Sequence, residues 1–437
     1  MRRISAAART TFRSLSIRNF RLFFVGQLIS QTGTWLTTIA QTLLVLHLTD
    51  SGVAIGGLVA CQFGPVLLLG AWAGAVADRH DKRKLLMVTQ ALEMVQSVAL
   101  AVLAFLPHPS LIGLYVVASF GGLFLAFDNP ARRSFVPEIV PTENVQNAAT
   151  LNSAIMTSAR VFGPALGGLL VVTLGYGWCF SIDALSYLAV LVALFMMHPA
   201  EFTRSPVVVR AKGQIRAGLR YTRQMPDLWV PMVMLTVIGM LTFNFSVTIP
   251  LFAEHTLHGN GTTYTLLYSV LSVGSLAGAL IASYQRLIEV RHVAIAALSF
   301  GVAMCIFALA PNLLFSFPTA ILVGLTSIGF LTTGSAIVQV RADPHMRGRV
   351  LALQSIVMIG STPIGGPILG YICDAYGARV GIAIGGFAAL GAGTWGLFAI
   401  RRIRTRPPTD GAAPAPSGHA TGTDATVTMT VEASRAP

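Results

Sequence analysis

Long apolar stretches alternate with short polar ones from about residue 20 to residue 400. A membrane-spanning helix needs about 20 mostly apolar residues, and twelve stretches reach that length. The predicted helices are 20–47, 53–77, 84–106, 111–128, 148–173 and 178–197 before a polar stretch, and 229–252, 263–285, 291–310, 313–339, 348–374 and 379–400 after it. The pattern therefore predicts an all-α membrane protein with twelve transmembrane helices.

The same pattern divides the chain into domains. A basic segment, 1–19, precedes the first helix, and two six-helix bundles, 20–198 and 229–400, lie on either side of a cytoplasmic linker, 199–228. The remaining residues are rich in Pro, Ala, Thr and Gly and have little apolar content. We therefore expect a disordered cytoplasmic tail over 401–437.

The two halves share short motifs at corresponding positions. In the second helix, Gly70-Ala71-Trp72-Ala73-Gly74-Ala75 recurs in the eighth as Gly274-Ser275-Leu276-Ala277-Gly278-Ala279. In the fifth, Gly163-Pro164-Ala165-Leu166-Gly167-Gly168 recurs in the eleventh as Gly366-Pro367-Ile368-Leu369-Gly370. Glycines let membrane helices approach closely, which indicates a packing role for the helix 5 and helix 11 motifs. Parallel six-helix repeats of this kind occur in secondary transporters.

Polar side chains recur along one face of the first predicted helix. Gln27, Gln31, Thr34, Thr38 and Gln41 follow the spacing of a single helical stripe. A stripe facing lipid would leave its polar groups unsatisfied, so it must face protein or water. We interpret it as the wall of a substrate cavity, with hydrogen bonding between helices as the alternative.

Weaker candidates for the same cavity lie on three other helices. They are Tyr115, Ser119, Thr236, Asn244, Thr248, Thr326 and Thr333. Isolated hydroxyls are often satisfied by the carbonyl one turn back, which is the alternative for most of them.

Four ionisable residues fall inside or at the end of predicted helices, where charge is costly and usually functional. Arg160, near the middle of the fifth helix, needs a carboxylate or several carbonyls as partners, and Glu93 and Asp183 are the candidates. If the carboxylate paired with Arg160 takes up and releases a proton, this pair would couple transport to protons. The alternatives are a structural pairing for Arg160 and, for Asp128, a helix-end charge beside the headgroups.

Basic residues are placed asymmetrically. The chain has 30 Lys and Arg against 17 Asp and Glu, a net charge of +13, and only 11% of its residues are charged. Only Arg379 falls on one side of the predicted topology, where a loop meets the last helix, and only Arg160 falls inside a helix away from its ends. Lys and Arg favour the cytoplasmic side, so we expect a multi-pass protein of the cell (inner or plasma) membrane with both termini cytoplasmic. The basic residues are scattered between the apolar stretches, which argues against a nucleic-acid partner.

The sequence shows none of the catalytic patterns that we considered. It has no GxxxxGK[ST] loop for nucleotide phosphates, no HExxH motif and no supported Ser, His and Asp arrangement. The four cysteines are far apart in or near apolar segments, so buried thiols are expected. We expect no enzyme activity, cofactor or metal; the expected partners are a small-molecule substrate, protons and the lipid bilayer, and the expected state is a monomer.

The connection after the second helix reads Gly74-Ala75-Val76-Ala77-Asp78-Arg79-His80-Asp81-Lys82-Arg83-Lys84. It resembles the signature loop of the major facilitator superfamily, with His80-Asp81 in place of the usual glycine. The resemblance implies a cytoplasmic latch of Gly74, Asp78, Arg79 and Arg83, in which the aspartate docks near the N-terminal end of helix 11 in the outward-open state. An ordinary basic cluster that sets topology is the alternative.

Further stretches narrow the family. They are Asn19-Phe20-Arg21-Leu22-Phe23, Phe127-Asp128-Asn129-Pro130-Ala131-Arg132, Val136-Pro137-Glu138-Ile139-Val140-Pro141 and Asp183-Ala184-Leu185-Ser186-Tyr187. Together they are similar to the enterobactin-exporter-like and macrolide-efflux-like branch of drug:proton antiporters, over about 15–400. The arginine motif of helix 4 has no match in 111–128, and Thr34 stands where many members carry an acid.

The resemblance implies a major facilitator fold, two pseudo-symmetric six-helix bundles, and an antiporter signature in helix 5. It also implies proton-coupled export of small amphipathic compounds such as drugs, siderophores or secondary metabolites. An uptake symporter for a polar metabolite is one alternative. A non-transporting membrane receptor or interaction protein is the other.

Overall fold

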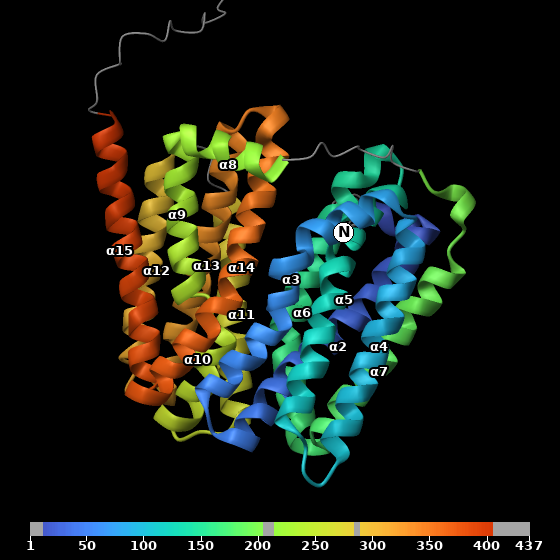
Figure 1. Ribbon diagram of the computed structural model, residues 1–437, viewed down its shortest axis with the longest axis horizontal. Coiled ribbons are helices and arrows are strands. Elements are labelled where there is room, and N and C mark those ends of the chain that lie inside the picture. Colours follow the sequence, from blue (N-terminus) through green and yellow to red (C-terminus); the bar gives the residue numbers. More distant parts are fainter. Residues whose placement is uncertain (1–11, 204–213, 284–288, 405–437) are drawn as a thin grey trace, which may run out of the picture.

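The computed structural model describes residues 12–203, 214–283 and 289–404, so most of the expected tail and most of the N-terminal basic segment lie outside the described residues. Residues 401–404, which were expected to begin the disordered tail, continue the last helix instead. The first half consists of α2 (Arg18–Thr49), α3 (Gly52–Arg79), α4 (Lys82–Phe105), α5 (Leu111–Phe135), α6 (Val145–Leu174) and α7 (Tyr176–Met196) (Figure 1). The second half consists of α9 (Pro226–Leu241), α10 (Phe245–Leu251) with the π-helical turn η5 (Phe252–Thr256), α11 (Gly261–Ser283), α12 (Val290–Ala308), α13 (Leu313–Arg341), α14 (Pro344–Tyr376) and α15 (Ala378–Arg404). Short helices lie in the connections: η1 (Arg13–Ser16), η2 (Val136–Glu138), η3 (Thr142–Asn144), η4 (Pro199–Glu201) and α8 (Gln214–Gln224).

Within the described ranges, eleven helical segments are long and apolar enough to cross a membrane, with α9, α10 and η5 counted as one. The long helix outside that set is α2, which has 32 residues but carries the glutamine and threonine stripe. With α2 buried among these spans, the protein is an all-α membrane protein of twelve long helical segments, as the apolar pattern predicts.

Local sequence signals account for where the helices begin and end. Short polar side chains accept from backbone N–H groups at the first turns of α4, α5 and α13, through Asp81, Ser110 and Asn312. Helices α6 and α14 end at glycines with positive φ, Gly175 (87°) and Gly377 (90°). These glycines follow the fifth and the eleventh spans, so the two halves also share their turn chemistry.

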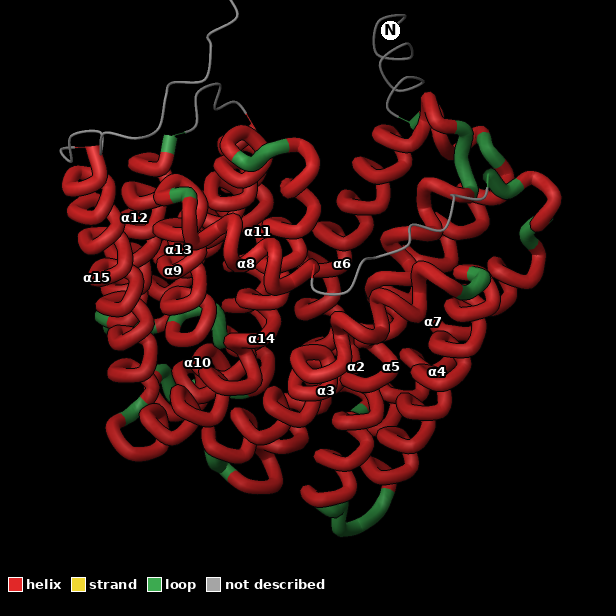
Figure 2. The backbone as a smooth tube through the Cα atoms, turned by 45° about the horizontal axis from the view of Figure 1, so that its top comes forward, coloured by secondary structure: helices red, strands yellow, loops and turns green. Residues whose placement is uncertain are grey.

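The two halves meet mainly where α3 packs on α14 and α6 packs on α11. Figures 1 and 2 show both described chain ends at the same end of the bundle, which we call the terminal end, and the opposite end we call the far end. The closest approaches between the two halves at these glycines lie toward the far end. A Cβ on Gly56 would be 2.6 Å from Gly366 O, and one on Gly168 would be 2.6 Å from Thr265 Cβ. Toward the terminal end the halves diverge (Figure 2).

Three elements differ from the sequence prediction. Helix α5 runs to Phe135 rather than to residue 128, because Pro130 is accommodated inside it. The predicted helix 229–252 is interrupted after Leu241, where Thr242 Oγ1 donates to Gly385 O at 2.9 Å. The polar stretch 199–228 contains the short helix α8, which lies across the terminal end of the second half (Figure 1).

Candidate functional site

Three glutamines of the α2 stripe are buried against the protein: Gln27, Gln31 and Gln41. Gln62 Nε2 of α3 donates to Gln41 Oε1 at 2.7 Å. The amide of Gln27 has no hydrogen-bond partner among the described side chains. An amide buried without a partner lowers stability, so packing alone does not account for Gln27 at this position.

The predicted hydroxyls of the cavity wall share one feature, which is a hydrogen bond to the carbonyl one turn back. The pairs are Thr34 to Ser30, Thr38 to Thr34, Ser119 to Tyr115, Thr236 to Met232, Thr248 to Asn244, Thr326 to Leu322 and Thr333 to Gly329. Tyr115 Oη donates to Ala54 O at 2.8 Å, and Asn244 Nδ2 donates to Met240 O at 2.8 Å. These donors are therefore satisfied by the backbone in this conformation.

Asp183 of α7 is fully buried where α2, α4 and α7 meet. Its Oδ2 accepts from Thr37 Oγ1 at 2.6 Å and from Ser97 Oγ at 2.7 Å. Ser186 Oγ lies 3.3 Å from Oδ1. The close approach of α2 depends on Gly33, because a Cβ there would lie 2.5 Å from Asp183 Oδ1. The described partners are all neutral, so no cation offsets a charge on this carboxylate.

A second buried group joins α4 to α5. Asp128 is fully buried and forms an ion pair with Arg132, one turn further along α5. Thr89 Oγ1 and Gln90 Nε2 donate to Asp128 Oδ1 at 3.1 and 2.9 Å. Gln90 Nε2 also donates to Glu93 Oε2 at 2.9 Å. Asp128 is thus not a helix-end charge beside the headgroups, and Arg132 is not a loop residue, since α5 continues past both.

Tyr187 connects these two groups. It is buried on α7, one turn beyond Asp183, and its hydroxyl lies close to Thr34 of α2. Its hydroxyl lies in the neighbourhood of Asp183, Glu93 and Arg132. The first half therefore contains an interior run of polar groups, which we call the acid band: Thr34, Thr37, Thr89, Gln90, Glu93, Ser97, Asp128, Arg132, Asp183, Ser186 and Tyr187.

Arg160 lies on α6, partly buried, and does not join the acid band. Its Nε has no hydrogen-bond partner among the described residues, and no ion pair links it to Glu93 or Asp183. The expected pairing is therefore not formed in this conformation. The reason is topological, because both acids lie where α4 and α7 pack together, whereas α6 packs mainly on α2 and α11.

The residues of the predicted latch are placed at the terminal end of α3 and the start of α4. Gly74 is buried, Arg79 ends α3, and Asp78 precedes it. Arg83 donates to the last carbonyls of α7, from Nε to Leu194 O at 2.8 Å and from Nη2 to Phe195 O at 3.1 Å. Arg83 therefore caps a helix within the first half in this conformation.

The helix 5 and helix 11 motifs lie at close helix approaches. A Cβ on Gly163 would be 2.8 Å from Trp35 Cγ, and one on Gly167 would be 3.2 Å from Ile39 Cβ, both on α2. Gly168 faces α11, and Gly366 and Gly370 face α3 of the other half. Pro164 and Pro367 lie inside α6 and α14.

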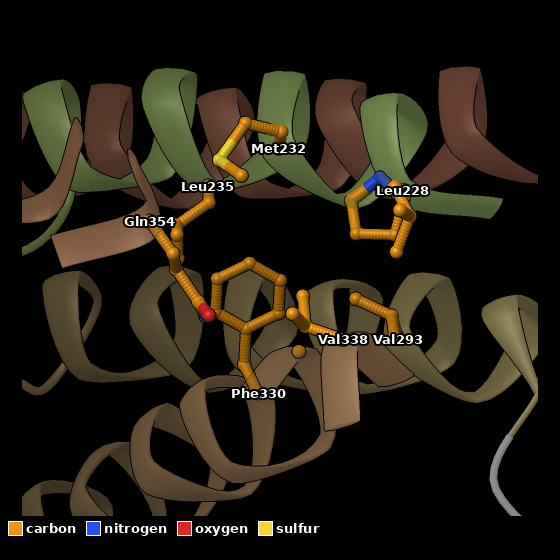
Figure 3. A pocket seen from close by; sticks show the side chains of 9 residues that line it. Leu228, Met232, Leu235, Val293, Phe330, Val338 and Gln354 are labelled. Carbon is orange, nitrogen blue, oxygen red and sulfur yellow. The ribbon is translucent and has the colours of Figure 1, made fainter. Parts of the chain in front are cut away.

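Two cavities differ in what they can hold. One of about 10 Å³ inside the second half is lined by apolar side chains such as Leu228, Phe330 and Val338, with Gln354 at its edge (Figure 3). It has room for about one water molecule and no solute. The other, about 390 Å³, lies at the far end and draws its lining from both halves: Leu43, His47, Val171, Val172, Tyr176, Glu254, Gly259, Asn260 and Gly261.

Sequence reasoning found the acids of the band but missed most of their partners. Thr89, Gln90, Glu93 and Ser97 recur on one face of α4, a polar stripe comparable to that of α2. This spacing is the feature of the sequence from which the partners on α4 could have been predicted. Arg132 was missed because Asn129-Pro130 is typical of a helix end.

The chain is similar to known transporters along nearly its whole length. The family model described as transmembrane secretion effector matches residues 9–436. The staphyloferrin A transporter of Staphylococcus aureus is 22% identical, over 82% of this chain and 90% of the relative. The enterobactin exporter EntS of Citrobacter koseri is 24% identical, over 90% and 95%. The multidrug efflux pump Tap of Mycolicibacterium fortuitum is 27% identical, over 82% and 89%.

Solved structures share the fold at low identity. A bacterial homologue of the human lysosomal transporter Spinster, in an inward-facing occupied conformation, has a TM-score of 0.68 and 16% identity, covering 91% of this chain and 99% of its own. A point mutant of the nucleoside transporter NupG has a TM-score of 0.70 and 12% identity, covering 87% and 99%. At these identities the likeness concerns the fold alone.

Proposed function

Because this chain belongs to the transmembrane secretion effector family of major facilitator transporters, we propose that it is a proton-coupled exporter of small amphipathic compounds that works by alternating access. Membership of that family makes it a transporter and not an enzyme. What we propose beyond family membership is the class of substrate and the identity of the coupling ion.

The observation that carries proton coupling is the burial of Asp183 among neutral partners. A carboxylate inside a membrane protein is costly when charged and is functional by default. Thr37 and Ser97 supply hydroxyls that can donate to the ionised form or accept from the protonated form. Asp128 differs, since Arg132 already offsets its charge. We therefore assign the exchangeable proton to Asp183, with Glu93 and Tyr187 on the path toward Asp128.

The proposed substrates follow from the relatives' names and from the uncharged polar side chains of α2. Two relatives are named for siderophores, staphyloferrin A and enterobactin, and a third for multidrug efflux. The described hydroxyls and amides of α2 suit uncharged polar groups on an amphipathic molecule. A siderophore, a drug or a secondary metabolite fits this description.

The distribution of basic residues supports an orientation with the terminal end in the cytoplasm. Lys82, Arg83, Arg341 and Arg349 lie at the terminal ends of their helices, whereas Arg379 lies at the far end. Lys and Arg concentrate on the cytoplasmic side of membrane proteins. The far end then faces the outside of the cell.

Transport in reconstituted vesicles tests the proposal. We expect an imposed proton gradient to drive uptake of a dye or siderophore into inside-out vesicles. Asp183→Asn should abolish accumulation driven by the proton gradient. It should leave intact the movement of substrate down its own concentration gradient. Glu143→Gln is the control, because this acid is exposed and pairs only with Arg13 among the described residues.

Three outcomes would contradict the proposal. Full gradient-driven accumulation by Asp183→Asn would remove Asp183 from the coupling. Accumulation only when the gradient is reversed would indicate an uptake symporter, and no movement of any compound would indicate a non-transporting receptor.

A further inference from the structure

Helices α3 and α14 run antiparallel across the boundary between the halves, and each carries an aspartate close to its C-terminal end. Asp78 lies one residue before the end of α3, and Asp374 lies two residues before the end of α14. Because the helices are antiparallel, each aspartate lies at the end of the bundle where the other helix begins. Asp78 lies at the terminal end and Asp374 at the far end.

At the far end, Asp374 is docked on the first turn of α3. Its Oδ1 accepts from the backbone N–H of Gly52 at 2.6 Å, and its Oδ2 accepts from the N–H of Val53 at 2.9 Å and from Ser51 Oγ at 2.7 Å. The first N–H groups of a helix have no partner within it, and the helix dipole favours an anion there. A side chain of the second half thus caps a helix of the first half.

The backbone around this contact is shaped for it. A Cβ on Gly52 would lie 2.8 Å from Asp374 Oδ1 and 2.8 Å from Gly370 O, so a larger residue does not fit without displacing α14. One turn further along α3, Gly56 approaches Gly366 and Pro367 in the same way. The carboxylate therefore lies at the end of a continuous close approach of α3 to α14.

Another polar contact between the halves lies at the same end. His255 Nε2 of η5 is 2.8 Å from Asp50 Oδ1, at the end of α2. Both residues are exposed, and Asp50 is 82% accessible at its side chain, so water and salt weaken this pair. The Asp374 contact differs because three donors converge on one carboxylate.

We propose that Asp374 and the first turn of α3 form an outer gate, in which Asp374 is the positioning residue. Its docking on α3 holds the far end closed, and its release lets that end open. When the far end opens, the halves close at the terminal end, where Asp78 comes to the start of α14. The two aspartates then act in alternation on the same helix pair. This inference rests on the proposed alternating-access function for its place in the cycle.

Distance measurement between spin labels tests the gate without any transport. In the full chain with all four cysteines replaced by alanine, labels at His108→Cys and Pro311→Cys report the separation of the halves at the far end. Both positions are exposed, in the α4–α5 connection and just before α13. The readout is the ratio of long to short distances by double electron–electron resonance in lipid nanodiscs.

Asp374→Ala should raise the ratio of far-end-open to far-end-closed molecules by roughly 2- to 30-fold, the range that follows from loss of an N-capping side chain. Asp374→Asn should give a smaller shift in the same direction, since one acceptor and the charge are lost. Asp78→Asn should shift the ratio the opposite way, and the double variant should return toward the wild-type ratio.

Asp81→Ala is the matched control. Asp81 caps α4 by accepting from Lys84 N at 3.1 Å, and donor and acceptor lie in the same half. It should lower thermal stability and leave the ratio unchanged. A folded, monodisperse Asp374→Ala protein with the wild-type ratio would overturn the proposal. A shifted ratio in a protein that transports nothing would keep the gate and refute the proposed function instead.

Discussion

The two halves share their helix frame, but they differ in what they bury. In the described part of the chain, the buried charged residues all lie in the first half: Glu93, Asp128, Arg132, Glu138 and Asp183. The buried polar residues of the second half are hydroxyls and amides, such as Thr248, Ser316 and Thr333. The corresponding glycine motifs keep the packing similar while the chemistry is confined to one bundle. We therefore expect the second half to serve as the surface against which the first half moves.

The largest expected effect follows from breaking the buried ion pair. Arg132→Ala leaves Asp128 buried without its cation, so the free energy of unfolding should fall by about 3–5 kcal/mol. The measurement is chemical unfolding in detergent micelles. The double variant Asp128→Leu with Arg132→Leu should recover most of that loss, because both charges are removed together. An Arg132→Ala protein as stable as the wild type would show that the pair contributes nothing.

A matched pair of threonine substitutions compares the halves directly. Thr37→Val removes a donor to Asp183 and should lower the free energy of unfolding by about 1.5–3 kcal/mol. Thr333→Val removes a bond to Gly329 O in its own helix and should stay within about 0.5 kcal/mol. Thermal unfolding and initial transport rates give the comparison. Equal effects in the two variants would mean that the halves do not differ in this respect.

A third prediction concerns the boundary between the halves. Gly56→Leu places a side chain against Gly366 and Pro367, so overpacking should lower stability by about 1–3 kcal/mol. Gly64→Leu, two turns further along α3, is the control, since a Cβ there meets nothing within 4 Å. The unfolding midpoint should fall for the first variant alone. A fall of similar size at Gly64 would indicate an effect of leucine on α3 itself.

The smallest effect is expected at the predicted latch. Asp78→Asn removes a charge that stabilises one state of the cycle, so the maximal transport rate should fall by roughly 2- to 5-fold. The apparent substrate affinity should not change. Initial rates over a range of substrate concentrations separate the two. An altered affinity with an unchanged maximal rate would contradict the latch and favour an ordinary basic cluster that sets topology.

Apolar periodicity was enough to predict the twelve spans because burial in lipid dictates their length. It did not predict the break after Leu241, although Gly239 lies two residues before it. That break depends on contacts from distant helices, namely the hydrogen bond from Thr242 to Gly385 O and the approach of Gly365 to Met240 O. Such contacts have no local signal.

The candidate site was predictable only in part, for a similar reason. Polar residues inside apolar helices are conspicuous, so Glu93, Asp128 and Asp183 were identified. Which partner each one has depends on the packing of α4 against α5 and α7, and this paired Asp128 with Arg132 and left Arg160 apart. Asp374 was not considered, because a helix-end acid at the surface looks ordinary until its neighbour is known.

The polarity of α2 also bears on how the protein is made. Helix α2 leaves the ribosome before the eleven spans that follow it and is less apolar than they are, so its transfer from the translocation machinery into lipid should be less favourable. Gln41 and Thr37 find their partners on α3 and α7. We therefore expect the first helix to enter the bilayer stably only after the sixth has been synthesised, so that the N-terminal bundle assembles as one cooperative unit.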